Sequence, residues 1–322
     1  MDLQLIFLTA AVSFILAVLA GPLCIPLLKR LKLGQQVRGD GPEGHLKKAG
    51  TPTMGGIVIL LAFTLAFVKF SEAGREFYAL LVATLGFGLV GLLDDSIKIV
   101  KKRSLGLTSL QKLAGQLLFA AIFCMLLIAS GHSTALSFPG LSGSFDGGPW
   151  IYYPFVVLML LAVSNAVNFT DGVDGLLSSV SAPAFGAYAL IAIQATQFPA
   201  AIGASAMAGA VLGFFVYNAH PARVFMGDTG SLGIGGAIGA IAVLTKQELL
   251  FLVIGGVFVV EMLSVALQVI SFKARGKRIF KMSPIHHHYE LSGWSERRIV
   301  AVFFGASLIL AAFGLYLGRG LL

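Results

Sequence analysis

The chain has 322 residues, of which 57% are apolar and only 12% are charged, and its mean hydropathy is +0.89. Ordinary globular proteins carry about 45–50% apolar and about 25% charged residues, so this composition excludes a soluble globular enzyme, and its low polarity excludes a disordered chain. The 23 basic and 15 acidic residues leave a net charge of +8, and their positions along the chain matter more than their sum.

Ten apolar runs approach the length needed to cross a bilayer as a helix. No lysine or arginine precedes the first run, unlike the start of a secretory signal peptide, so we expect it to remain as a span. The predicted spans are residues 3–28, 53–70, 77–93, 113–130, 150–168, 175–194, 200–217, 232–245, 249–272 and 299–318. The sequence therefore predicts an all-α integral membrane protein with about ten transmembrane helices, in which residues 1–322 form a single domain.

The basic residues are distributed unequally between the two sides of the membrane. Alternation of the ten spans places 19 of the 23 lysines and arginines on one side and four on the other. Cytoplasmic loops of membrane proteins are enriched in lysine and arginine. We therefore expect the 19-residue side to be cytoplasmic and both termini to be extracytoplasmic.

Acidic residues gather at the predicted cytoplasmic ends of the third, fifth and seventh spans. The five are Asp94, Asp95, Asp171, Asp174 and Asp228. A carboxylate close to hydrocarbon needs a partner, a cation or water, so five at one face predict a shared polar site. The adjacent pair suits Mg²⁺, which prefers one or two carboxylates together with substrate phosphate oxygens. If the third helix continues past its apolar run, Asp94 and Lys98 lie on one face and can pair.

Three further segments carry chemistry-bearing side chains. In NAVNFTDGVDG, Asn165, Asn168, Asp171 and Asp174 recur every three residues, which predicts a polar stripe on one face of a helix end. Asp228 is the only acid of the segment 218–231, where Asp-Thr-Gly-Ser also fits a plain helix N-cap. In PIHHHYE, three consecutive histidines favour phosphate contact over zinc binding, since no cysteine or HExxH accompanies them.

Other patterns are less informative. Glu261 lies in the middle of the ninth span, where we expect a structural hydrogen bond, and a functional role stays open. GxGxxG at residues 86–91 lies inside a span with no preceding strand, so it does not predict dinucleotide binding. A Walker loop is absent from the sequence, and we expect no nucleic-acid partner.

Taken together, the polar segments resemble those of the phospho-N-acetylmuramoyl-pentapeptide transferases, within the wider family of polyprenyl-phosphate N-acetylhexosamine 1-phosphate transferases. The matching segments follow the family's order over nearly the whole chain. They are Lys48 with TPTMGG (51–56), GLLDDSIK (91–98), NAVNFTDGVDGL (165–176), FMGDTGS (225–231), VVEMLSVALQV (259–269) and PIHHHYE (284–290). Phe169 and Val173 stand where many members have leucine.

The resemblance implies an enzyme of the bacterial plasma membrane that uses Mg²⁺. It implies transfer of phospho-N-acetylmuramoyl-pentapeptide from its UDP carrier to undecaprenyl phosphate, at the cytoplasmic face, giving lipid I and UMP in peptidoglycan biosynthesis. It also suggests a homodimer. The substrates would be UDP-N-acetylmuramoyl-pentapeptide and a membrane lipid.

The resemblance also implies functional roles for the residues of this chain that stand at the family's motif positions. The resemblance makes Asp94 and Asp95 the acidic pair, with Asp94 the residue that deprotonates the lipid phosphate, and Asp228 the magnesium ligand. The nucleoside-binding positions match Asn168, Asp171, Gly172, Val173, Asp174, Asn218 and Phe225, with Phe225 placed to stack on uracil. The positions near substrate phosphates or catalysis match Lys48, Thr53, Lys98, Lys112, His286 and His287.

Two alternatives remain open at this point. Within the family, the donor could be UDP-N-acetylglucosamine, although the PIHHHYE segment is characteristic of the peptidoglycan branch. From a different class, the chain could be a secondary transporter, whose acids gather near the bilayer midplane. Only Glu261 is central here.

Overall fold

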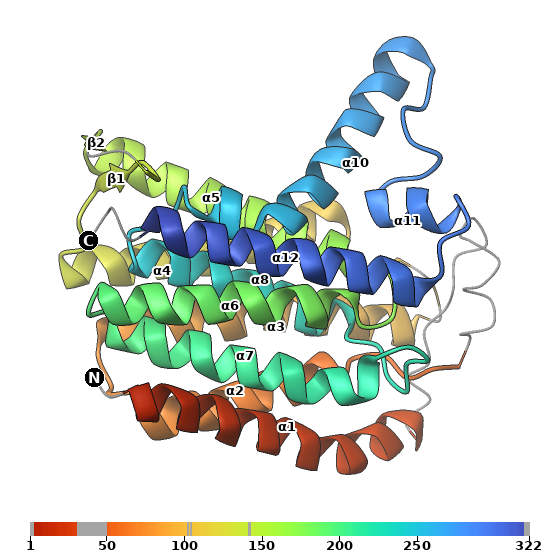
Figure 1. Cartoon of the computed structure of the whole chain (residues 1–322), viewed down its shortest axis with the longest axis horizontal. Coiled ribbons are helices and arrows are strands. Elements are labelled where there is room, and N and C mark those ends of the chain that lie inside the picture. Colours follow the sequence, from red (N-terminus) through yellow and green to blue (C-terminus); the bar gives the residue numbers. More distant parts are fainter. Residues whose placement is uncertain (1–2, 31–49, 102, 104, 141–142, 319–322) are drawn as a thin grey trace.

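The computed structural model describes residues 3–30, 50–101, 103, 105–140 and 143–318, so the predicted site residue Lys48 lies outside the described residues. The described chain is almost entirely helical (Figure 1). Its helices are α1 (Leu3–Arg30), α2 (Gly56–Phe70), α3 (Arg75–Val100), α4 (Ser109–Ser130), α5 (Pro149–Thr170), α6 (Leu176–Gln194), α7 (Phe198–Asn218), α8 (Gly227–Leu244), α9 (Phe251–Ile254), α10 (Gly256–Arg275), α11 (Ile285–Glu290) and α12 (Glu296–Gly318).

The predicted spans correspond to these helices. Within the described residues, nine helices are long and apolar enough to cross a membrane, and α2 is a shorter apolar helix of 15 residues. The all-α, multi-pass membrane fold is therefore confirmed. The start of α1 and the end of α12 lie at the same end of the bundle (Figure 1), as an even number of crossings requires.

Three helix boundaries differ from the prediction, and the first two of them shape the polar end of the bundle. Helix α3 runs on to Val100, so the acidic pair lies within its last two turns. Helix α8 begins at Gly227, five residues before the predicted start at residue 232. The predicted ninth span is interrupted at Gly255, which separates α9 from α10. Glycine lowers helix stability, and two successive glycines break the run here.

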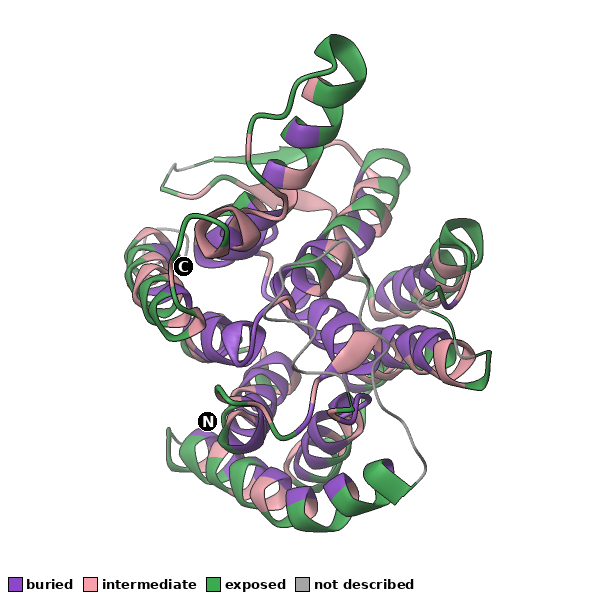
Figure 2. Cartoon of the chain, turned by 90° about the vertical axis from the view of Figure 1, so that its right-hand side faces the viewer, coloured by how far each residue is buried: buried purple, intermediate pink, exposed green. Residues whose placement is uncertain are grey.

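Helix α8 lies at the centre of the bundle and is almost wholly buried. Helices α6 and α7 are also mostly buried, whereas α1, α4, α10 and α12 turn large apolar side chains outward. Figure 2 shows this arrangement end-on, with buried residues concentrated in the central helices. Outward apolar faces on long helices are what a lipid environment requires. Helix α10 also leans away from the other helices (Figure 1).

The glycines of the 86–91 motif bring helices together. A Cβ built on Gly91 would lie 2.0 Å from the backbone oxygen of Asp228, so only glycine allows α3 and α8 to approach this closely. One turn earlier, a Cβ on Gly88 would meet the flexible Leu60 side chain at 2.5 Å. The motif therefore serves helix packing, and at Gly91 it sets the distance between two acidic segments.

A small hairpin stands at the end of the bundle opposite α11 (Figure 1). Its strands β1 (Ala135–Ser137) and β2 (Ser144–Asp146) are antiparallel, and Leu136 pairs with Phe145. Just before the hairpin, a ring nitrogen of His132 lies 3.2 Å from the Tyr152 hydroxyl. Burial, followed by the charge of a nearby lysine, lowers the pKa of His132 to about 4. This histidine is therefore neutral at physiological pH.

Candidate active site

Three aspartates form an acidic cluster where the end of α3 meets the start of α8. Asp94 and Asp95 lie in the last turns of α3, and Asp228 lies in the first turn of α8. Each offers a carboxylate oxygen, and these oxygens all lie within 4.8 Å of one another. Of the five acids predicted to share one polar site, the structure brings these three together, whereas Asp174 belongs to a separate group.

Lysine side chains neutralise this acidic cluster. The Lys98 ammonium lies 2.6 Å from Asp94 Oδ2 and 2.9 Å from Asp228 Oδ2, with Asp95 Oδ1 at 3.5 Å. The predicted pairing of Asp94 with Lys98 along one helix face is therefore confirmed. Lys112 of α4 adds a second ammonium, 3.0 Å from Asp228 Oδ2. The two cations offset much of the repulsion among the three close carboxylates.

Asp95 is held by the amino end of α8. Its Oδ2 accepts hydrogen bonds from the Thr229 backbone N–H at 2.9 Å and from the Thr229 hydroxyl at 2.7 Å. Its Oδ1 accepts a longer bond, 3.3 Å, from the Asp228 N–H. Free N–H groups at a helix start attract negative charge, so Asp95 joins α3 to α8. Sequence reasoning missed Thr229, which no spacing rule connects to Asp95.

Asp228 is not a helix N-cap. The residue at the N-cap position of α8 is Met226, and the helix start has no side-chain capping bond. Instead, Asp228 Oδ1 accepts a hydrogen bond of 2.9 Å from the Asn168 amide, while Oδ2 faces the two lysines. The same amide donates to Ser231 Oγ at 2.7 Å. The capping interpretation of the Asp-Thr-Gly-Ser segment is therefore wrong.

Thr53 reaches the site through a backbone connection between two distant segments. Phe225 N–H donates to the Pro52 carbonyl, and the amides of Gly55 and the next residue donate to the 225–226 carbonyls, all at 2.8–2.9 Å. Gly227 has φ +73°, and a Cβ there would lie 2.9 Å from Thr53 Oγ1 and 2.6 Å from an Asp95 oxygen. Only glycine has space at this position, and the close packing brings the Thr53 hydroxyl beside the acidic cluster.

The predicted polar stripe over residues 165–174 is wrong beyond the end of α5. Asn165 donates to Gln116 Oε1 of α4 at 3.2 Å, whereas Asn168 faces Asp228. The helix ends at Thr170, so Asp171 caps it and Asp174 lies in the following turn. Burial, and then the negative charges of the neighbouring aspartates, raise the pKa of Asp171 to about 7.

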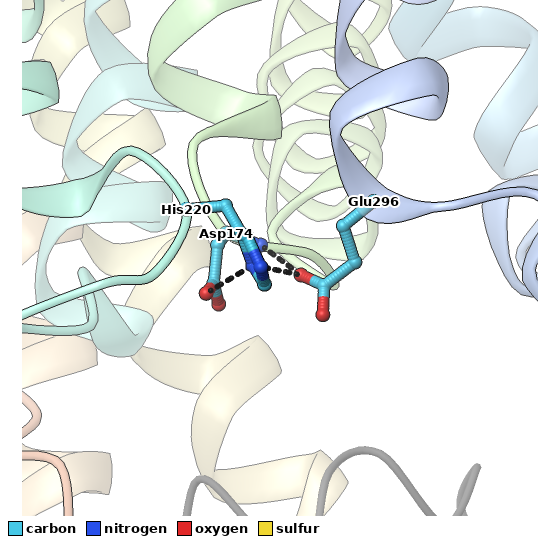
Figure 3. A group of neighbouring side chains, drawn as sticks. All are labelled: Asp174, His220 and Glu296. Atoms are coloured by element: carbon cyan, nitrogen blue, oxygen red, sulfur yellow. Dashed lines mark hydrogen bonds and ion pairs between the residues drawn. The ribbon is translucent and has the colours of Figure 1, made fainter.

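Asp174 is one of a group of three side chains from three elements. Its buried carboxylate accepts hydrogen bonds from the Ala222 N–H at 3.0 Å and from His220 Nδ1 at 3.1 Å. Glu296, the first residue of α12, accepts the Asp174 backbone N–H at 3.1 Å and lies 3.6 Å from the same histidine nitrogen. Figure 3 shows His220 lying between the two carboxylates. Sequence reasoning missed His220, and nothing in its local sequence marks it.

Three other predicted nucleoside-binding residues lie in the segments next to this group. Asn218 is buried, and its amide is engaged on both sides, accepting from the Ser178 hydroxyl and donating to the Val224 carbonyl at 3.1 Å. It therefore holds the 218–225 segment in place. The Phe225 ring is only partly buried, and Val173 is buried in the turn between α5 and α6.

The three histidines of α11 point in different directions, as expected of consecutive residues on a helix. His286 is fully buried and faces Glu261 of α10, with 3.1 Å between Nδ1 and Oε2. His287 is mostly buried and pairs with Glu290 at 3.0 Å. His288 accepts a hydrogen bond from the Lys281 N–H. The hydrogen bond expected of Glu261 is therefore present, and His286 is its partner.

The donor set of the acidic cluster fits a hard divalent cation. Its atoms are carboxylate oxygens from Asp94, Asp95 and Asp228, close enough together to share one ion, and Mg²⁺ takes oxygen ligands of this kind. Asp174, His220 and Glu296 also bring ligand atoms within 4.8 Å of one another. That second group includes a histidine nitrogen, whereas the acidic cluster offers only the carboxylate oxygens that Mg²⁺ prefers.

Comparison with known proteins assigns the chain to a family. Residues 77–246 match the model of glycosyl transferase family 4, and residues 48–60 match signature 1 of phospho-N-acetylmuramoyl-pentapeptide-transferase. The enzymes of that name from Bacillus pumilus and Geobacillus thermodenitrificans are each 57% identical to the chain, and that of Bacillus subtilis is 55% identical. Each match covers 98% of both proteins. The chain belongs to the phospho-N-acetylmuramoyl-pentapeptide-transferase family.

Membership in this transferase family confirms the resemblance that the motifs indicated. The region matched by the glycosyl transferase family 4 model includes Asp94, Asp95 and Asp228 with both of their lysines. The matched signature at residues 48–60 contains Thr53 and the segment that hydrogen-bonds to residues 225–226. The two matched regions therefore meet at the acidic cluster.

Proposed function

We propose that this chain transfers phospho-N-acetylmuramoyl-pentapeptide from its UDP carrier to undecaprenyl phosphate, giving lipid I and UMP. An oxygen of the lipid phosphate attacks the phosphorus attached to the sugar, and the bond from that phosphorus to UMP breaks. One substrate is confined to the bilayer and the other is a soluble nucleotide, so the reaction requires a site at the membrane surface.

The observation that carries this proposal is the acidic cluster with its two lysines. Asp94, Asp95 and Asp228 lie at one end of membrane-crossing helices, and Lys98 and Lys112 contact them. Phosphoryl transfer depends mainly on positioning the reactants and on neutralising charge with metal ions and cationic groups. A secondary transporter would instead be expected to gather its acids near the bilayer midplane.

Each part of the cluster has a chemical role. The carboxylates, Asp228 foremost, would hold Mg²⁺, which when bound supplies charge neutralisation to the pyrophosphate. The ammonium groups of Lys98 and Lys112 are mobile donors on long side chains and contact substrate phosphates. Thr53 and His287 border the same phosphates. The lysine contacts with Asp228 keep its carboxylate ionised in the absence of substrate.

Asp94 takes the proton from the lipid phosphate in a single displacement. Its Oδ1 accepts the Leu107 N–H at 2.9 Å, and its Oδ2 lies 2.6 Å from Lys98. The lipid phosphate is itself a competent nucleophile, and bound Mg²⁺ together with the two lysines would offset the repulsion between the two anions, so no covalent aspartyl intermediate is required. The acceptance of a proton requires only that Asp94 lie within hydrogen-bond reach of the lipid phosphate.

The nucleoside binds beside the cluster, on the turn that follows α5. Asp171, Gly172 and Asp174 line this turn, and the partly buried Phe225 ring is available to stack on uracil. Asn168 and Asn218 hold the two flanking segments in register. This site faces the cytoplasm of a bacterial plasma membrane, as the positive-inside rule indicates, and the enzyme forms a homodimer.

The test is a direct comparison of two donors. Purified enzyme is given undecaprenyl phosphate with either UDP-N-acetylmuramoyl-pentapeptide or UDP-N-acetylglucosamine, and lipid product and UMP are measured with and without Mg²⁺. We expect product only from the pentapeptide donor and only with the metal. Product from UDP-N-acetylglucosamine alone would refute the proposal and favour the other branch of the superfamily.

A further inference from the structure

Glu261 and His286 form an ionisable pair inside the protein, next to the proposed nucleoside site. Both side chains are fully buried, although α10 is otherwise an outer helix with many exposed apolar residues. Burying a carboxylate with an imidazole costs free energy that close-packed apolar residues would avoid. Glu261 lies in a membrane-spanning helix, where an ionisable side chain marks a functional position by default.

The pair contacts the turn after α5, which is the proposed nucleoside site. His286 Nδ1 lies 3.1 Å from Glu261 Oε2, which uses one ring nitrogen and fixes the plane of the imidazole. The other ring nitrogen faces Gly172, because a Cβ built there would lie 2.0 Å from Nε2 and 2.6 Å from Cε1. Glycine is required at this point of the turn for the imidazole to pack against its backbone.

Two buried atoms of the pair are left without a hydrogen-bond partner among the described residues, Glu261 Oε1 and His286 Nε2. The ring is thus held by one hydrogen bond on one edge and by packing against Gly172 on the other. Helix α10 leans away from the bundle (Figure 1), so this connection joins an outlying helix to the turn after α5.

We infer that Glu261 is a positioning residue that acts through His286 to hold the 171–175 turn in the conformation that binds the nucleoside. The inference rests on the proposed function, in which this turn contacts the UDP moiety. The orienting element is the hydrogen bond from Nδ1–H to the carboxylate. Without it the imidazole rotates about its bond to Cβ, and the support beneath Gly172 is lost.

The variants of Glu261 are chosen by whether they keep an oxygen that can accept the hydrogen bond from His286 Nδ1–H. Glu261→Gln keeps an oxygen that accepts the Nδ1–H, whereas Glu261→Met keeps the side-chain length and removes the acceptor. Ser264→Ala is the matched control, because Ser264 is a buried polar residue one turn further along the same helix. Its hydroxyl donates to the backbone carbonyl of Glu261, so the variant removes a neighbouring hydrogen bond and leaves the Glu261 carboxylate in place.

We expect Glu261→Met to raise the KM for the UDP donor about tenfold, the lower end of what removing a partner that orients a functional histidine costs. The KM for undecaprenyl phosphate should change less than twofold. Glu261→Gln and Ser264→Ala should stay within threefold of wild type for both substrates. A general loss of structure would affect both substrates, so the donor-specific change is the informative readout.

A double variant tests whether Glu261 acts through the histidine. If it does, Glu261→Met combined with His286→Ala has the same donor KM as His286→Ala alone, because the second change removes the same support. Multiplied effects, or a Glu261→Met enzyme with the wild-type donor KM, would overturn the inference while leaving the proposed function intact.

Two further measurements test the inference if the wild-type enzyme is inactive or if the Glu261→Met variant does not fold. If the wild-type enzyme makes no lipid I, the proposed function fails, and the affinity of the protein for UMP is measured in place of the donor KM. Equal UMP affinities of wild type and Glu261→Met would then refute the inference. If Glu261→Met does not fold, the ¹⁵N spectrum of histidine-labelled wild type decides. A proton on Nδ1 of His286 supports the inference, and an unprotonated Nδ1 refutes it.

Discussion

Replacing Gly91 by alanine tests whether helix packing sets the geometry of the acidic cluster. The new Cβ would lie 2.0 Å from the backbone oxygen of Asp228, and backbone cannot rotate away as a side chain can. Contact between such atoms is ordinary only beyond about 3.4 Å, so α3 and α8 must move apart by about 1 Å or more. We expect this displacement to stretch the bonds from Asp228 and Thr229 to Asp95.

The expected magnitude follows from those bonds. A hydrogen bond to a charged group contributes about 1.5–3 kcal/mol, so losing two of the three at the lower value costs about 3 kcal/mol. At 1.4 kcal/mol per tenfold change, turnover should fall about 100-fold, if the bonds hold Asp95 in its working position. Overpacking itself costs about 1–3 kcal/mol, so the thermal unfolding midpoint should fall as well.

The assay measures UMP release by enzyme in detergent, together with thermal unfolding of the same preparations. Gly88→Ala is the matched control, since its Cβ would meet the flexible end of Leu60 and the side chain can move. We expect the control to keep turnover within about threefold of wild type. A Gly91→Ala enzyme with near-normal turnover would refute the argument that this contact sets the geometry of the cluster.

Four other predictions concern different parts of the molecule. Asp228→Asn should lose activity and regain at most part of it at higher Mg²⁺, and near-normal turnover at ordinary Mg²⁺ would contradict the metal role. Asp94→Asn should slow turnover about 10²–10⁴-fold with partial recovery at higher pH; UMP exchange into the donor by wild-type enzyme freed of polyprenyl phosphate, abolished in this variant, would instead establish a covalent intermediate. A cysteine that replaces Arg278 should be labelled only from the cytoplasm, and a cysteine that replaces Ser144 should be labelled only from outside. The reverse pattern would show that the predicted topology is inverted. Burial lowers the pKa of His132 in the folded protein to about 4, so the unfolded chain binds a proton at this residue more readily than the folded protein does. The stability of the fold should therefore fall as the pH drops from about 6.5 to 4. In His132→Gln, the thermal unfolding midpoint should depend less on pH over this range.

Much of the fold was predictable from the sequence because it depends on local, periodic properties. Hydrophobic runs predict membrane helices, and the basic loops predict their orientation. The pairing of Asp94 with Lys98 followed from helical spacing alone, since both residues lie on α3. The gathering of acids at span ends was predictable because alternate helices end on the same side of a membrane.

The tertiary structure decided which acids touch and what holds them. Asp95 bonds to Thr229, 134 residues away, and Asp174 N–H bonds to Glu296, 122 residues away. The contact of Glu261 with His286 likewise joins separate helices. Spacing rules describe neighbours three or four residues apart on one helix, whereas these contacts depend on how closely helices pack. That distance is set by glycine positions such as Gly91, whose effect appears only when the facing backbone is in place.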